Sequence, residues 1–306
     1  MCAILVQEWL APAIIPLSVM ARLALVTDSV CTIPQELQEE YQITIVPMSF
    51  LLEETTYVDN GSLNWLEFYA LLKSARRLPT TAAPSPGAFF DAFREVYQQG
   101  SREVLCIVTS SQLTATYNAA CDGARLARHE LADMRIKVID SRCAAAALGF
   151  VVLTAARAAA SGVSLEEAAN KAEALIPRMY MLGFLGTLEY VAKGGRVPQV
   201  AAWLSALLKM KHIFQLHDGN IIRLGAVRTN PKAMDRLLQL ASQRLNRRKP
   251  LHVAVFHTRA VDAAEALANR VREEFRPAEL FVSEFSQVMS IHTGPGLIGL
   301  SFYNDP

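Results

Sequence analysis

The residue types best suited to binding or proton chemistry lie near the end of the chain, where His292 stands just before Gly294, Pro295 and Gly296. An imidazole ring can donate or accept a hydrogen bond near neutral pH, and the glycines permit a tight turn. The apolar stretch 297–303 that follows predicts a final buried strand. A single histidine beside such a strand is typical of a satisfied core residue, so its role depends on which other polar groups reach the same place.

Polar side chains also follow three apolar segments that have the composition of strands. Asp28, the pair Ser110 and Ser111, and Asp140 each come directly after or just beyond such a segment. In an open parallel sheet, ligands bind outside the carboxyl ends of the strands. Aspartate and serine also cap helices, which is our first interpretation of the two aspartates. The stretch 109–117, TSSQLTATY, is rich in hydroxyl groups at the start of a predicted helix, where free N–H groups can bind an anion.

Three further polar features have simple structural interpretations. The proline-rich loop 78–87 contains Thr80 and Thr81, and a rigid surface loop would explain it. Arg228 follows a predicted hairpin and has the pattern of a solvated arginine. The stretch 193–196, KGGR, predicts the end of a helix with two solvated bases, or a surface on which a partner docks. None of these features is specific when it is taken alone.

The elements that must position these residues alternate between strand and helix in the first half of the chain. Short apolar runs predict strands, and segments with helical spacing or helix-start signals predict helices. The strands are expected at 23–27, 43–47, 50–58, 103–109 and 135–140, and the helices from 34, at 63–75, at 87–98, from about 115 and from 143. This alternation predicts βαβ units and a parallel sheet.

The pattern changes beyond about residue 177. Strands are predicted at 178–185, 251–256 and 279–285, helices before 195, at 198–210 and after 260, and a hairpin turns at Asp218 and Gly219. We therefore expect an α/β protein of two domains. They are an N-terminal parallel-sheet domain (21–176) and a C-terminal α+β domain with antiparallel pairing (177–306). Residues 1–20 contain Gln7 and Glu8 and lack a basic start, which argues against a secretory signal, so we expect an extension outside the fold.

Composition excludes several classes of function. Of 306 residues, 52% are hydrophobic and 19% are charged, and the formal net charge is +1, so a nucleic-acid partner is not expected. The five cysteines show no metal-ligand spacing, which favours the reducing cytoplasm. The longest apolar run, Cys143 to Ala156, is shorter than the roughly 20 residues of a membrane span. We expect it to be a buried helix, and we expect no stable membrane insertion.

Several short motifs, taken in their order along the chain, resemble those of a known protein family. The motifs are VTDS (26–29), TTAAP (80–84), SSQLTATY (110–117), VIDS (138–141), KGGRV (193–197), LLKMK (207–211), VRT (227–229) and HTGPGLIG (292–299). From about Leu23 to Phe302 the chain resembles the DegV family of bacterial fatty-acid-binding proteins. The resemblance implies that two α/β domains enclose one long-chain fatty acid in a pocket between them. It also implies a fatty-acid kinase as partner, which phosphorylates the bound carboxylate for phospholipid synthesis. The carrier itself would be no enzyme and would need no cofactor.

The resemblance assigns the carboxylate contacts residue by residue. It places Thr81, Thr114, Arg228 and His292 at the fatty-acid carboxylate. The pocket around them would be supported by Asp28, Ser110, Ser111, Asp140, Gly294 and Gly296.

The chain departs from the family pattern in two places. Ala82 and Ala83 stand where the family prefers Ser and Gln, and Thr114-Ala115 replaces Ser-Gly. Threonine keeps the hydroxyl but adds a methyl group beside the carboxylate, which would tighten or reorient the head-group contact.

Elementary energetics agree with a lipid ligand. A chain of about 14 methylenes gains roughly 0.8 kcal/mol per buried CH₂, or about 11 kcal/mol in total. A buried unpaired carboxylate is costly, and two hydroxyls, a guanidinium and an imidazole would offset that cost.

The alternative from another class is a lipid-binding enzyme, a hydrolase or acyl transferase. It would use Ser110, Ser111 or Thr114 with His292 and Asp140. Against it, the sequence holds no G-x-S-x-G elbow, no metal-ligand cluster and no Walker-type phosphate loop. A regulatory lipid sensor would differ from the carrier only in its partner.

Overall fold

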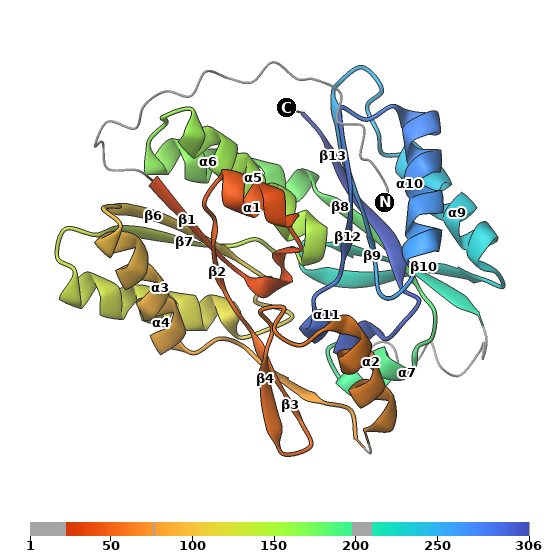
Figure 1. Ribbon diagram of the computed structural model, residues 1–306. Coiled ribbons are helices and arrows are strands. Elements are labelled where there is room, and N and C mark those ends of the chain that lie inside the picture. Colours follow the sequence, from red (N-terminus) through yellow and green to blue (C-terminus); the bar gives the residue numbers. More distant parts are fainter. Residues whose placement is uncertain (1–22, 76, 198–209, 306) are drawn as a thin grey trace.

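The computed structural model describes residues 23–75, 77–197 and 210–305, and its strands form three sheets (Figure 1). Sheet A is four-stranded and parallel in the order β2-β1-β6-β7. Its strands are β1 (Leu23–Asp28), β2 (Thr44–Val46), β6 (Glu103–Val108) and β7 (Arg135–Asp140). Each predicted strand of this sheet is confirmed, because an apolar run of this length between helical segments is typical of a strand buried on both faces.

Helices cover both faces of sheet A. Val104 and Cys106 of β6 pack with α3 (Pro86–Gln98) and α4 (Thr116–Glu130), whereas Leu105 and Ile107 belong to the buried cluster around α5 (Ala145–Ala160). This alternation follows the two-residue period of a strand. Two further helices of this half are α1 (Gln35–Glu40) and α6 (Leu165–Leu175).

Sheet C has six strands in the order β10-β9-β8-β13-β11-β12, and all neighbours are antiparallel except β11 and β12. The strands are β8 (Tyr180–Leu185), β9 (Lys211–His217), β10 (Asn220–Val227), β11 (Leu251–His257), β12 (Glu279–Glu284) and β13 (Ile298–Asn304). Its outer face is covered by α9 (Asn230–Ser242) and α10 (Val261–Phe275). The predicted fold class, a parallel-sheet half followed by a half with antiparallel pairing, is confirmed. The predicted hairpin turns at Asp218 and Gly219, both with positive φ.

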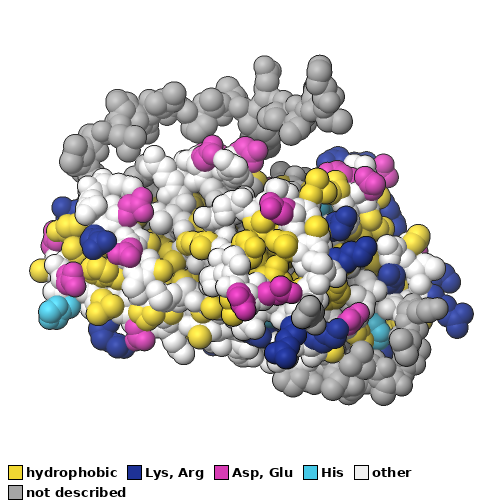
Figure 2. All heavy atoms as spheres, turned by 60° about the horizontal axis from the view of Figure 1, so that its bottom comes forward, with side chains coloured by type: hydrophobic (Ala, Val, Ile, Leu, Met, Phe, Trp, Pro, Cys, Tyr) yellow, Lys and Arg dark blue, Asp and Glu magenta, His cyan; other side chains and the backbone are white. Residues whose placement is uncertain are grey.

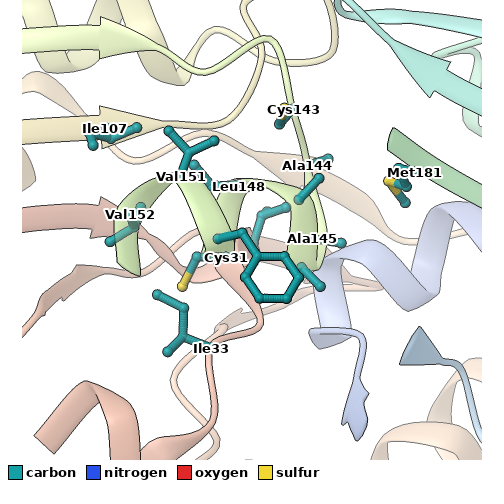
Figure 3. Close-up of a cluster of buried hydrophobic side chains, with 14 of the residues drawn as sticks. Cys31, Ile33, Ile107, Cys143, Ala144, Ala145, Leu148, Val151, Val152 and Met181 are labelled. Carbon is teal, nitrogen blue, oxygen red and sulfur yellow. The ribbon is translucent and has the colours of Figure 1, made fainter. Parts of the chain in front are cut away.

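The Ala-rich helix α5 lies between sheets A and C (Figures 1 and 3). It contacts β1 and β6 on one side and β11 and β13 on the other. The Phe150 ring lies 5.2 Å from the rings of both Phe281 and Tyr303 of sheet C. Arg157 of α5 forms a bidentate ion pair with Glu279, with nitrogen–oxygen distances of 2.5 and 3.1 Å. Most of the run Cys143 to Ala156 is thus a buried core helix, as expected. No helix among the described residues is long and apolar enough to cross a membrane.

The predicted domain boundary near residue 177 falls in a short 3-10 turn, Ile176–Arg178. One buried cluster nevertheless contains side chains from both sides of that boundary, because α5 packs on both sheets. The boundary therefore stays a prediction about the chain and does not separate two independent cores. The predicted extension over residues 1–20 and, apart from Met210, the predicted helix at 198–210 lie outside the described residues.

Sheet B is a small antiparallel sheet in the order β4-β3-β5. It consists of β3 (Ser49–Leu52), β4 (Thr55–Val58) and β5 (Thr80–Ala82), with α2 (Trp65–Ser74) beside it. The polar interruption in the predicted strand 50–58 is the turn of the β3–β4 hairpin, where Glu53 has a φ of 55°. The expectation of a plain loop at 78–87 is wrong at its centre, because 80–82 pairs with β3 as an edge strand between two prolines.

Two short helices pack together beside sheet B, namely α7 (Glu189–Gly194) and α11 (Gln287–Thr293). His292 lies in the last turn of α11, whereas the sequence predicted only a turn before the final strand. Gly294 ends this helix with a φ of 69°. A side chain at Gly294 would overlap the Tyr190 ring of α7, so glycine is needed both for the backbone and for the contact between the helices.

Candidate functional site

An apolar cavity of about 290 Å³ lies where the three sheets meet. Its volume is close to the lower end of the roughly 300–1,000 Å³ that small-molecule sites occupy. Much of its wall is formed by aliphatic and aromatic side chains, among them Met48, Met181, Leu185, Phe214, Leu216 and Leu297. They come from sheet C and from the segments next to sheets A and B, so the fold brings the cavity together from both halves of the chain.

Three polar side chains of the cavity wall, those of Thr81, Arg196 and His292, form one cluster, which we call the polar end. The Thr81 Oγ1 lies 2.8 Å from His292 Nε2, although 211 positions separate the two residues in sequence. The Nη2 of Arg196 donates to the same Thr81 oxygen at 3.4 Å. Thr81 is placed by its pairing in β5, and His292 by α11, so sheet B and α11 together create this cluster.

The environment of His292 favours the neutral ring. Burial, aided by the positive charge of Arg196, lowers the pKa of His292 to about 4. Its Nδ1 is buried without a hydrogen-bond partner in the described part of the chain. That nitrogen faces Gly194, where an added Cβ would lie 2.9 Å away.

The unpartnered nitrogen bears on the tautomer of His292. A proton on Nε2 avoids burying an Nδ1–H donor without an acceptor. Thr81 then accepts from both His292 and Arg196, and its own O–H is free to donate to a ligand in the cavity. The cluster in this state presents a hydroxyl donor and a guanidinium, which suits a carboxylate.

Thr114 lines the cavity from the segment before α4. Its Oγ1 lies 2.8 Å from Thr116 Oγ1 and accepts from the Thr116 N–H at 3.3 Å. Thr116 is fully buried at the first position of α4, so the pair fixes the Thr114 hydroxyl beside a helix start. Free N–H groups at such a start favour negative charge.

The structure does not bring Arg228 to this cluster. Arg228 is exposed just beyond the end of β10, which is the edge strand of sheet C, and it does not line the cavity. The arginine at the polar end is Arg196, which follows α7 and bonds back to the Gly194 carbonyl oxygen at 2.9 Å. Of the four residues that the resemblance assigned to the carboxylate, Thr81, Thr114 and His292 line the cavity and Arg228 does not.

The predicted supporting residues lie outside the cavity wall and are held by bonds of their own. The buried Asp28 accepts from Thr109 N and Oγ1, at 2.7 and 2.8 Å, and from Val30 N at 3.0 Å. Thr109 does line the cavity, so the support from Asp28 is indirect. Ser110 is likewise buried, and its Oγ accepts from the Gln112 N–H at 3.3 Å.

Asp140 holds a neighbouring loop in the same way. It accepts from Ser111 Oγ at 2.5 Å and from Arg142 N at 2.9 Å. Gly294 and Gly296 act through the backbone, where both have positive φ. These residues shape the loops around the site and do not line its wall.

The family model described as an uncharacterised protein of the DegV family matches residues 22–305. The chain belongs to the DegV family. A DegV domain-containing protein of Streptomyces coelicolor is 35% identical over 283 residues, which cover 90% of this chain and 96% of the relative.

Solved DegV-family structures share the fold. A fatty-acid-binding DegV protein from Thermus thermophilus superposes with a TM-score of 0.83 at 28% identity, covering 93% of this chain and 100% of the other. A protein from Eubacterium ventriosum described as binding stearic acid superposes with a TM-score of 0.85 at 27% identity, covering 92% and 98%.

Sequence reasoning did not single out Arg196 as a cavity residue of this DegV-family chain. The residue stood within the KGGR stretch, which was interpreted as a helix end with solvated bases or as a docking surface for a partner. The available signal was the glycine pair, because Gly195 adopts a φ of 66° and turns the chain at the end of α7. That turn lets the Arg196 guanidinium return to Gly194 and Thr81.

Proposed function

We propose that this protein binds one long-chain fatty acid in the cavity, with the carboxylate at the Thr81, Arg196 and His292 end. The observation that carries the proposal is the division of one cavity into an apolar body and a compact polar end. Arg196 lines that end and forms no ion pair with a carboxylate among the described residues. The fatty acids of the related DegV structures support the same ligand class.

The binding energy is expected to come chiefly from the tail. About 14 methylenes contribute roughly 11 kcal/mol in total, against association costs of about 4–15 kcal/mol. The polar end then decides which class of ligand is accepted. Because His292 is neutral, Arg196 is the residue that balances the negative charge of the carboxylate. The hydroxyls of Thr81 and Thr114 supply further hydrogen bonds.

We further propose that the protein acts in the cytoplasm as a carrier and presents the bound carboxylate to a fatty-acid kinase, which forms the acyl phosphate for phospholipid synthesis. The exposed position of Arg196 supports this role, because it places the polar end at the surface. Figure 2 shows hydrophobic side chains exposed between acidic and basic ones on the face seen when the sheet B end is turned forward.

The first test is mass spectrometry of an organic extract of the purified protein. We expect an intact free acid of roughly C14–C20 at near-stoichiometric amount, as the methylene energetics require. A nucleotide or sugar phosphate in its place would contradict the proposal. An empty site together with esterase turnover would favour the enzyme alternative.

The second test separates holding the acid from presenting it. In an assay with a partner kinase, His292→Ala is expected to reduce turnover more than affinity, since phosphoryl transfer requires one carboxylate oxygen to be correctly placed. Ala144→Leu is the matched control, because Ala144 is 1% exposed and lines the cavity, so its enlargement obstructs the tail. It is expected to reduce affinity more than turnover at saturating acid. If the loss of turnover relative to the loss of affinity is the same for both variants, the presenting role is contradicted.

A further inference from the structure

The buried carboxylate of Asp59 connects three segments that are far apart in sequence. Asp59 follows β4 and is 7% exposed. Its Oδ2 accepts from the Ser29 hydroxyl at 2.8 Å, and its Oδ1 accepts from the Gln287 N–H at 3.1 Å. Ser29 Oγ in turn accepts from the N–H of Met48, a cavity residue, at 3.1 Å.

The contact with Gln287 matters because Gln287 is the first residue of α11, the helix that carries His292. The Gln287 side chain is itself held, since its Nε2 donates to the Leu63 carbonyl oxygen at 2.5 Å. The start of α11 is thus fixed to the segment that follows β4. A seven-residue helix is too short to be stable alone, so such tertiary contacts determine where it lies.

Sheet B also carries Thr81, through the pairing of β5 with β3. The same small sheet therefore positions both partners of the 2.8 Å contact, Thr81 directly and His292 through Asp59 and α11. Burial raises the pKa of the Asp59 carboxyl, while bonds from Ser29 and Gln287 oppose that rise. The Asp59 carboxyl group accepts hydrogen bonds from these donors and does not line the cavity.

We propose that Asp59 is a positioning residue for the polar end of the cavity: it anchors α11 to the segment after β4 and thereby holds His292 against Thr81. The inference rests on the proposed function for its effect on fatty-acid binding. Its effect on the geometry of His292 is independent of any ligand.

The decisive experiment measures the titration of His292 by NMR in ligand-free protein, with the resonance assigned from His292→Gln. His292 faces Thr81 and the charge of Arg196, and its pKa in the intact site is about 4. Asp59→Ala releases the start of α11, so water reaches the ring and the His292 pKa is expected to rise toward the unperturbed value of about 6.5. Asp59→Asn keeps an oxygen acceptor for the Gln287 N–H and is expected to restore most of the low value.

Glu279→Gln is the control for a loss of stability alone. Glu279 is likewise a largely buried carboxylate that joins distant segments, through Arg157 and His252, but it does not contact α11. It is expected to lower the melting temperature and leave the His292 titration unchanged. If Glu279→Gln shifts His292 as much as Asp59→Ala does, or if Asp59→Ala leaves its pKa near 4, the positioning role is overturned.

Palmitate titrations then link this geometry to the proposed function. Asp59→Ala is expected to weaken palmitate binding about tenfold, and Asp59→Asn less than threefold. A shifted His292 pKa with unchanged palmitate affinity would overturn the effect of Asp59 on binding while leaving its geometric role intact. A wild-type protein that binds no fatty acid would contradict the proposed function without bearing on the titration result.

Discussion

Two groups of polar side chains differ in how completely they are paired. At the carboxyl edge of sheet A, Asp28 accepts three hydrogen bonds, and Asp140 is held by Ser111 and Arg142. Beside sheet B, the Thr81 hydroxyl accepts from His292 and Arg196 and keeps its own O–H for a further acceptor. Complete pairing is what a structural group needs, whereas unused donors and acceptors are available to a ligand. The number of hydrogen bonds left unmade distinguishes the two groups better than the types of residue do.

Asp28→Ala tests the structural side of this comparison and should have the largest effect. It leaves the Thr109 and Val30 donors buried without an acceptor, at roughly 1–3 kcal/mol each. We expect the free energy of unfolding, measured in urea, to fall by at least about 3 kcal/mol. A normal unfolding curve with lost lipid binding would show that Asp28 belongs with the functional group.

Thr81→Val and Thr80→Val form a matched pair on the other side. The two residues are neighbours in β5, but only Thr81 lines the cavity, because successive strand residues face opposite ways. Loss of a hydrogen bond to a charged group costs about 1.5–3 kcal/mol, so Thr81→Val should weaken fatty-acid binding about 10- to 150-fold. Thr80→Val should change it by less than about threefold, as is usual for a surface position. Calorimetric titration with the same acid compares the pair, and equal losses would mean that strand stability is being measured.

Arg196→Gln and Arg228→Gln distinguish the arginine that lines the cavity from the one the resemblance implied. Arg196 is exposed and screened by solvent, so its loss should weaken binding only about 3- to 10-fold, and less at high salt. Arg228→Gln should have no measurable effect. The reverse order of effects would restore Arg228 to the carboxylate site.

The smallest expected effect is a pH dependence that belongs to His292. Its folded pKa of about 4 lies below the unfolded value near 6.5, so the unfolded chain binds more protons between these limits. Stability should therefore rise with pH across this window, by roughly 1 kcal/mol between pH 5.5 and 6.5. His292→Gln should remove that part of the dependence in urea unfolding series. Burial also lowers the pKa of His257. The contribution of His292 is therefore obtained from the difference in pH dependence between the wild-type protein and His292→Gln.

The longer elements could be predicted from the sequence because their own residues determine them. The strands β1, β6, β7 and β11 are apolar runs, and the β9–β10 turn has its Asp-Gly signal. The elements next to the site were missed because they depend on distant partners. The strand β5 exists through its pairing with β3, and α11 through its contacts with Asp59 and α7.

The same limit applies to the site. Thr81, Thr114 and His292 could be expected at one place from the family resemblance. The glycine pair before Arg196 is the local signal that separates it from Arg228, but where the Arg196 side chain ends depends on distant partners, because Thr81 lies 115 positions away. The anchoring role of Asp59 is equally invisible in sequence, since 228 positions separate it from Gln287.

The central position of α5 has a consequence for the exchange of ligand. The helix packs on both sheet A and sheet C, so a hinge that separated the sheets would expose one of its apolar faces to water. Such exposure costs roughly 25 cal/mol for each Å² of apolar surface. Entry and exit of a fatty acid are therefore expected to use small movements of sheet B, α7 and α11, whose short elements surround the polar end. The rate of exchange should then respond to substitutions in these segments while the melting of the main body stays a single transition.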